Sequence, residues 1–100
     1  MNAKVEEAEG RYVVTLDGEM DTAAAKDVES MLQPLYNTGG KDVLIDCTHL
    51  EYISSSGLRM LLSILKGAKA SGGKVTLRGV NDDIRNVLTL TGFIQIFQFE

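Results

Sequence analysis

The residues whose types and spacing best suit chemistry are three consecutive serines, Ser54, Ser55 and Ser56, followed by Gly57. A helix pattern begins directly after them, and a serine at a helix N-cap presents its hydroxyl beside unpaired backbone amides. Gly57 is expected to leave the approach to the Ser56 hydroxyl open. A phosphoryl group adds about −1.5 to −2 charge, which a helix N-terminus tolerates. The pattern therefore suggests phosphorylation of Ser56, although serines also cap helices without being modified.

Two kinds of catalytic chemistry compete with this interpretation. A serine nucleophile needs a nearby base, and the only histidine is His49, with no G-x-S-x-G motif around the serines. Asp46 suggests a receiver domain that accepts phosphate on aspartate, but residues 93–100 contain no lysine for such a site. The residue pattern favours a binding module over an enzyme.

The elements around the serines are predicted from hydrophobic periodicity. The apolar run Val43–Ile45 predicts a central strand that ends at Asp46, so the serines are expected in a loop at the carboxyl end of that strand, where sites gather in parallel sheets. The helix after Ser56 should end at Ser71–Gly73. Its apolar stripe consists of Leu58, Leu61, Leu62, Leu65 and Ala68.

The N-terminal part of the chain predicts a hairpin and then a helix. Residues 11–17 alternate with a period of two, and Glu9-Gly10 is a plausible turn from a preceding strand over residues 3–8. Asp21 or Thr22 can cap the helix that follows, and Pro34 should kink it or stop it early. Its expected apolar stripe is Ala24, Val28, Met31 and Leu35.

The C-terminal part continues the alternation of strand and helix. Val75 and Leu77 mark a strand, and a short helix should start at Asn81–Asp83 and close at Gly92. The order predicts a single α/β domain over residues 1–100. Its sheet should be mixed but mainly parallel, with four or five strands, an N-terminal hairpin, and the two longer helices on one face.

Composition limits the classes of partner and compartment. The chain has 100 residues, 44% of them apolar, and a formal charge of −4 with no basic cluster, which argues against nucleic acid as a partner. It has no apolar stretch long enough to span a membrane, and residues 1–10 carry four charges in place of a signal peptide. We expect a cytoplasmic protein without a cofactor. Cys47, the single cysteine, is expected to be a buried, inert thiol.

Four segments together resemble the STAS family, which includes bacterial anti-sigma-factor antagonists and the cytoplasmic tails of sulfate transporters. The resemblance covers nearly the whole chain and is far more specific than any one of its parts. The segments are Leu16–Asp21, Val43–Asp46, Tyr52–Leu62 and Leu90–Phe93.

The resemblance implies residue roles. In the antagonists the phosphorylated residue directly precedes the glycine that opens the second helix, which is Ser56 here. Many members carry an aspartate two positions earlier, where this chain has Ser54. Asp21 matches an acidic residue near the phosphorylation loop, although its role can equally be that of an N-cap. Asp46 is expected to organise the loop through hydrogen bonds.

The resemblance also implies a binding cycle. The unphosphorylated protein would bind an anti-sigma factor with a histidine-kinase-like ATPase fold and so release a sigma factor. That partner, acting as a serine kinase, would phosphorylate Ser56, and a metal-dependent serine phosphatase would reverse the modification. The docking residues expected from the loop and the exposed part of the second helix are Asp21, Ser54, Ser55, Ser56, Gly57, Arg59, Met60 and Ser63.

Two further expectations follow. Gly57→Val should impair docking more than stability, because the first helical turn should accept the larger side chain. The alternative function is a STAS module that acts as a scaffold or accessory subunit in another system, such as a stress-sensing assembly, lipid transport or secretion regulation.

Overall fold

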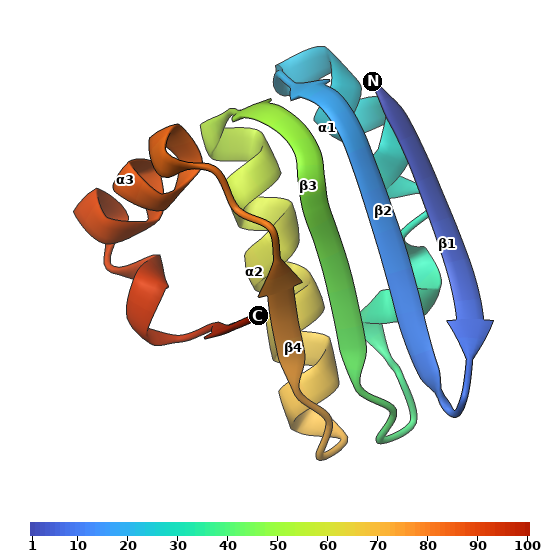
Figure 1. Ribbon diagram of the computed structural model, residues 1–100. Helices are drawn as coiled ribbons and strands as arrows, with labels where there is room; N and C mark the ends of the chain where they lie inside the picture. The colour runs from blue at the N-terminus through green and yellow to red at the C-terminus, as the bar shows by residue number, and fades with distance from the viewer.

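The sheet of the computed structural model, which describes residues 1–100, contains five strands in the spatial order β1-β2-β3-β4-β5. β1 pairs antiparallel with β2, and every other neighbouring pair is parallel (Figure 1). This confirms the predicted mixed sheet with an N-terminal hairpin. The strands are β1 (Asn2–Ala8), β2 (Arg11–Met20), β3 (Val43–Ile53), β4 (Val75–Arg78) and β5 (Gln98–Phe99).

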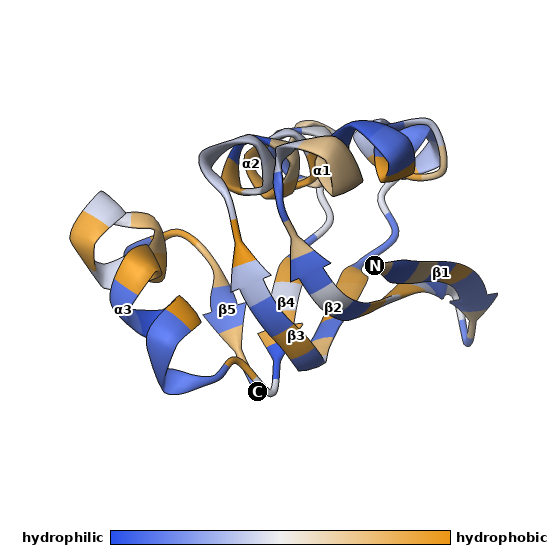
Figure 2. Cartoon of the chain, turned by 90° about the horizontal axis from the view of Figure 1, so that it is seen from above, coloured by the Kyte–Doolittle hydropathy of each residue, from blue (hydrophilic) through white to orange (hydrophobic).

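Three α-helices and two short 3-10 helices connect these strands. Helices α1 and α2 lie together over one face of the sheet, as predicted, whereas α3 lies apart from them toward the β5 edge (Figure 2). None of the helices combines the length and the apolar composition that crossing a bilayer requires. The helices are α1 (Thr22–Glu29), η1 (Gln33–Tyr36), α2 (Ser55–Ala70), α3 (Asp82–Thr91) and η2 (Phe93–Gln95).

The core lies between the sheet and the α1/α2 layer. Val14 and Leu16 of β2 are fully buried, as the period of two predicts, and β3 contributes Ile45. The predicted stripe of α2 is buried except for the partly exposed Leu62. A single cluster of 23 buried residues joins these elements, and its apolar contacts hold α2 against the sheet.

Strand β3 is much longer than predicted. It continues past Asp46 to Ile53, because its backbone pairs with β2 as far as the Met20–Ile53 pair, with two register shifts on the way. The prediction of a loop after Asp46 is therefore wrong. Only Ser54 separates β3 from α2, so the position of the serines is set directly by the sheet.

Helix α1 is shorter than its apolar spacing suggests. It ends at Glu29, well before Pro34, which lies at the start of η1, so the predicted early stop is confirmed. Because the helical period stops there, Met31 is 46% exposed and Leu32 is buried in its place. The predicted core position of Met31 is wrong for this reason.

Candidate functional site

Ser54 is the N-cap of α2. Its backbone is extended, its Oγ accepts a hydrogen bond from the Gly57 amide at 3.2 Å, and the residue is only 8% exposed. Its own amide donates to the Met20 carbonyl at 2.8 Å, which ties the helix start to β2. The prediction that Ser56 caps the helix is therefore wrong, because the helix begins two residues earlier than the pattern indicated.

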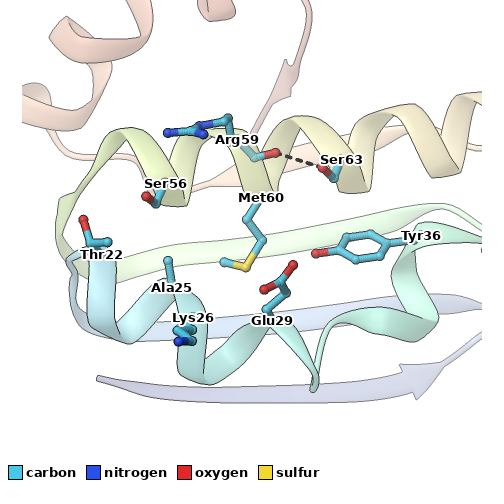
Figure 3. A pocket seen from close by; sticks show the side chains of 9 residues that line it. All are labelled: Thr22, Ala25, Lys26, Glu29, Tyr36, Ser56, Arg59, Met60 and Ser63. Carbon is cyan, nitrogen blue, oxygen red and sulfur yellow. Dashed lines mark hydrogen bonds between the residues drawn. The ribbon is translucent and has the colours of Figure 1, made fainter.

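Ser55 and Ser56 form the first turn of α2 beyond the cap. Ser55 is exposed and Ser56 is half-buried. The prediction that Ser55 lies deeper in a loop than Ser56 is therefore wrong. In Figure 3 the Ser56 side chain points toward α1 and makes no hydrogen bond to the other residues drawn. Of the three hydroxyls, that of Ser54 is engaged in capping, whereas that of Ser56 is free beside the start of α1.

Gly57 packs against the core and does not expose Ser56. A Cβ at this position would lie 2.7 Å from Ile53 Cγ1 and 2.9 Å from Met20 Sδ, which is too close for real atoms. The residue is buried because it lies four positions before Leu61, on the inner face of α2. The expectation that the first helical turn would accept the larger side chain of Gly57→Val is contradicted by this packing.

A surface hollow separates the first turns of α1 from α2, and we call it the α1–α2 hollow. It has a volume of about 340 Å³. Thr22 and Ser56 lie at one end, and Tyr36 and Ser63 lie at the other (Figure 3). Its full lining is Thr22, Ala25, Lys26, Glu29, Tyr36, Ser56, Arg59, Met60 and Ser63.

The hollow has an apolar floor and a polar rim. Ala25 and Met60 are 4% and 6% exposed and form the floor. The prediction that Met60 lies on the exposed part of α2 is therefore wrong. Met60 is buried because it faces α1 across the gap between the helices (Figure 3). Arg59 and Ser63 are exposed as expected, and the Ser63 hydroxyl donates to the Arg59 carbonyl at 3.1 Å.

The charges around the hollow are unevenly distributed. Lys26 and Arg59 contribute two cations, and neither forms a salt bridge within the protein. Glu29 is the one carboxylate of the lining and lies beside Tyr36 at the end away from Ser56. Burial, and then the Glu29 charge, raise the pKa of Tyr36. The rim near Ser56 is thus suited to an anion.

Asp21 lies at the start of α1, outside the lining of the hollow. Its Oδ1 accepts a hydrogen bond from the Ala24 amide at 2.8 Å, so the predicted N-cap role is confirmed. Asp21 is exposed, and it follows Met20, whose carbonyl accepts the hydrogen bond from the Ser54 amide. A docking role for Asp21 stays a prediction.

Asp46 and Cys47 lie in the middle of β3, away from the serines. Asp46 Oδ1 accepts hydrogen bonds from the Thr48 hydroxyl at 2.6 Å and from its amide at 3.0 Å. The hydroxyl bond is the main reason why the pKa of Asp46 is lowered. Asp46 therefore organises strand residues and not the serine loop. Burial raises the pKa of Cys47 to about 12, which agrees with an inert thiol.

Five residues of the hollow were not identified as site residues from the sequence: Thr22, Ala25, Lys26, Glu29 and Tyr36. Of these, Thr22 and Lys26 are four positions apart on α1 and therefore lie on one face of the helix. That spacing was a usable signal, but only once α1 and α2 are known to be neighbours. Tyr52, 49% exposed two residues before Ser54, was also missed.

The fold and the hollow define a class of protein: a small α/β domain that presents free serine hydroxyls at a helix start, between two helices on one face of a mixed sheet. The model of the STAS domain family matches residues 2–100. The chain belongs to the STAS domain family.

The individual proteins that this chain resembles are described as anti-sigma factor antagonists. The chain is 30% identical to BtrV of Bordetella bronchiseptica, described as an anti-sigma factor antagonist, over 97% of this chain and 84% of the relative. An anti-sigma factor antagonist from Mycobacterium paratuberculosis is 26% identical, with a TM-score of 0.79, over 98% of this chain and 83% of the other.

The anti-sigma factor antagonist SpoIIAA of Bacillus shares the fold in two states. Its unphosphorylated form superposes with a TM-score of 0.78 over 99% of this chain and 87% of that one. Its phosphorylated form superposes with a TM-score of 0.76 over 99% and 91%. Each is 19% identical to this chain, so the similarity concerns the fold.

Proposed function

We propose that this protein is an anti-sigma-factor antagonist whose binding is switched by phosphorylation of Ser56. The observation that carries the proposal is the free Ser56 hydroxyl at the end of the α1–α2 hollow, in a chain that resembles known antagonists over nearly its full length. Ser54, by contrast, is buried and engaged as a cap.

The proposed cycle begins with the unphosphorylated protein bound to an anti-sigma factor of the histidine-kinase-like ATPase fold, which releases its sigma factor. That partner transfers the γ-phosphoryl group of ATP to Ser56. The Oγ–P bond forms, the bond to ADP breaks, and the hydroxyl proton passes to a base of the kinase. A metal-dependent serine phosphatase restores the hydroxyl by directing water onto phosphorus, which releases inorganic phosphate.

The docking surface consists of the exposed residues around the first turn of α2. The accessible residues there are Ser55, Ser56, Arg59 and Ser63, and the exposed Asp21 follows Met20, which is hydrogen-bonded to Ser54. Beneath this surface lie three buried residues, Ser54, Gly57 and Met60. Phosphorylation adds charge and hydration at the mouth of the hollow, which opposes docking without any need to unfold the domain.

Affinity capture from extract of the native cell, with ADP in place of ATP so that Ser56 stays unphosphorylated, tests the proposed partner. Wild-type protein and Ser56→Ala should both retain a protein of the kinase-like ATPase fold, because neither carries a charge at residue 56. Ser56→Asp should retain less, although one carboxylate has less charge than phosphate and its effect should be partial. Ser55→Asp is the matched control, since it adds the same charge one residue earlier.

Binding that is identical for all four proteins would contradict the switch. Capture only of scaffold, transport or secretion components, with no kinase-fold protein, would instead support the alternative of a STAS module in another system. Loss of binding in Ser56→Ala would show that the hydroxyl itself is needed for docking, against the proposed cycle.

A further inference from the structure

We infer that Arg59 and Thr22 hold the phosphate of phosphorylated Ser56 within the same chain, at the mouth of the α1–α2 hollow. The inference rests on the proposed phosphorylation and concerns what the modification does locally. The modification would then act in two ways, by adding charge and by withdrawing Arg59 from the docking surface.

The position of Arg59 on α2 provides the first argument. It lies three residues after Ser56, and helical side chains point back over the preceding turn. Figure 3 shows the Arg59 side chain extending along α2 toward the turn that carries Ser56. Its guanidinium has no carboxylate partner in the protein and matches phosphate oxygens in a bidentate geometry. Arg59 is therefore available to an anion on Ser56.

Thr22 provides the second argument, from the opposite wall. It is the first residue of α1, and its hydroxyl points into the same end of the hollow as Ser56. In Figure 3 the only hydrogen bond among the lining residues joins Ser63 to Arg59, so the Thr22 hydroxyl is free to donate. A phosphate that extends from Ser56 across the gap would meet this donor.

The other charged and titratable groups at this end set the background. Asp21 is nearby but its carboxylate caps α1, and Lys26 adds a cation from the same helix. Glu29 and Tyr36 line the distant end of the hollow. Glu19 and Glu51 lie on the ends of β2 and β3. These groups act equally in wild-type protein and in an Arg59 variant, so a comparison of the two isolates the contribution of Arg59.

The test uses protein in which phosphoserine is incorporated at position 56 during translation, so that no kinase is needed. The second pKa of the phosphate is measured by ³¹P NMR titration. A nearby guanidinium favours the dianion and lowers this pKa, so Arg59→Gln should raise it by about half a unit. Lys66→Gln is the matched control, because it removes one positive charge from α2 at a position about 15 Å from Ser56 along the helix axis.

The outcomes separate cleanly. Arg59→Gln should raise the phosphate pKa clearly more than Lys66→Gln, Arg59→Lys should lie between wild type and Arg59→Gln, and Thr22→Val should raise it by a smaller amount. Equal shifts in Arg59→Gln and Lys66→Gln would overturn the inference. If the pKa behaves as expected but no kinase labels Ser56, the proposed function fails while the phosphate contact stands. If a kinase labels Ser56 but the phosphate pKa does not respond to Arg59→Gln, the proposed function stands and the phosphate contact is wrong.

Discussion

The inner and outer sides of the first turn of α2 consist of similar residues but differ in what they do. On the inner side, Ser54 caps the helix and Gly57 lets it approach Met20 and Ile53 closely. On the outer side, Ser55 and Ser56 are accessible and their hydroxyls are not used by the fold. The direction in which each residue points, and not its chemical type, therefore decides whether it serves stability or binding.

The largest expected effect on the inner side is that of Gly57→Val. The added Cβ would overlap Ile53 and Met20, and overpacking of this kind costs about 1–3 kcal/mol. Urea denaturation should show a corresponding loss in the free energy of unfolding. Ser55→Val, which places the same side chain on the outer side, should change it by less than about 0.5 kcal/mol. Equal losses in the two variants would remove the distinction between the sides.

A smaller effect is expected from loss of the cap. Ser54→Ala removes the acceptor for the Gly57 amide and should lower the free energy of unfolding by about 1 kcal/mol, whereas Ser55→Ala should leave it almost unchanged. Thermal denaturation of both variants measures the difference. If Ser55→Ala is the more destabilising of the two, the assignment of Ser54 as the N-cap is wrong.

The smallest effect is a pH dependence that arises in the middle of β3, away from the turn. The pKa of Asp46 is lowered from 3.8, chiefly by the Thr48 hydroxyl. A carboxyl with a lowered pKa contributes stability above its unfolded-state pKa and loses it as the pH falls through its folded-state pKa. The destabilisation by Asp46→Asn should therefore be present at neutral pH and shrink below pH 3.8.

Denaturation curves of wild type and Asp46→Asn, at neutral pH and below pH 3.8, check this expectation. Asp27→Asn is the control for loss of a surface charge. Thr48→Val should remove most of the same pH dependence, because it deletes the main donor. A destabilisation by Asp46→Asn that grows in acid would contradict the assignment. A confirmed effect would separate the pH dependence of the fold from any pH dependence of binding at Ser56.

Periodicity predicted most of the fold because burial dictates it. The stripe of α2 and the alternation of β2 both reflect one buried face, and both appear in the structure. The end of β3 was not predictable in this way. Thr48, His49 and Glu51 are exposed, and the strand continues there because His49, Leu50 and Tyr52 pair with β2 across two register shifts. Pairing between distant segments leaves little trace in the local pattern.

The site was predicted in part, for a related reason. A serine triplet before a helix does not show which serine is the cap, and the choice depends on where β3 ends. One signal was available: Gly57 lies four and seven residues before Leu61 and Ile64, and this places it on the buried face. Ser54 stands where many family members have aspartate, and either residue can cap a helix.

The central claim is that Ser56 accepts the phosphate, and phosphopeptide mapping by mass spectrometry tests it most directly. After incubation with the captured kinase and ATP, wild-type protein and Ser55→Ala should each carry one phosphate, on Ser56. Ser56→Ala should carry none. Phosphate on Ser54, Ser55 or Thr48 with Ser56 unmodified, or full labelling of Ser56→Ala, would contradict the account.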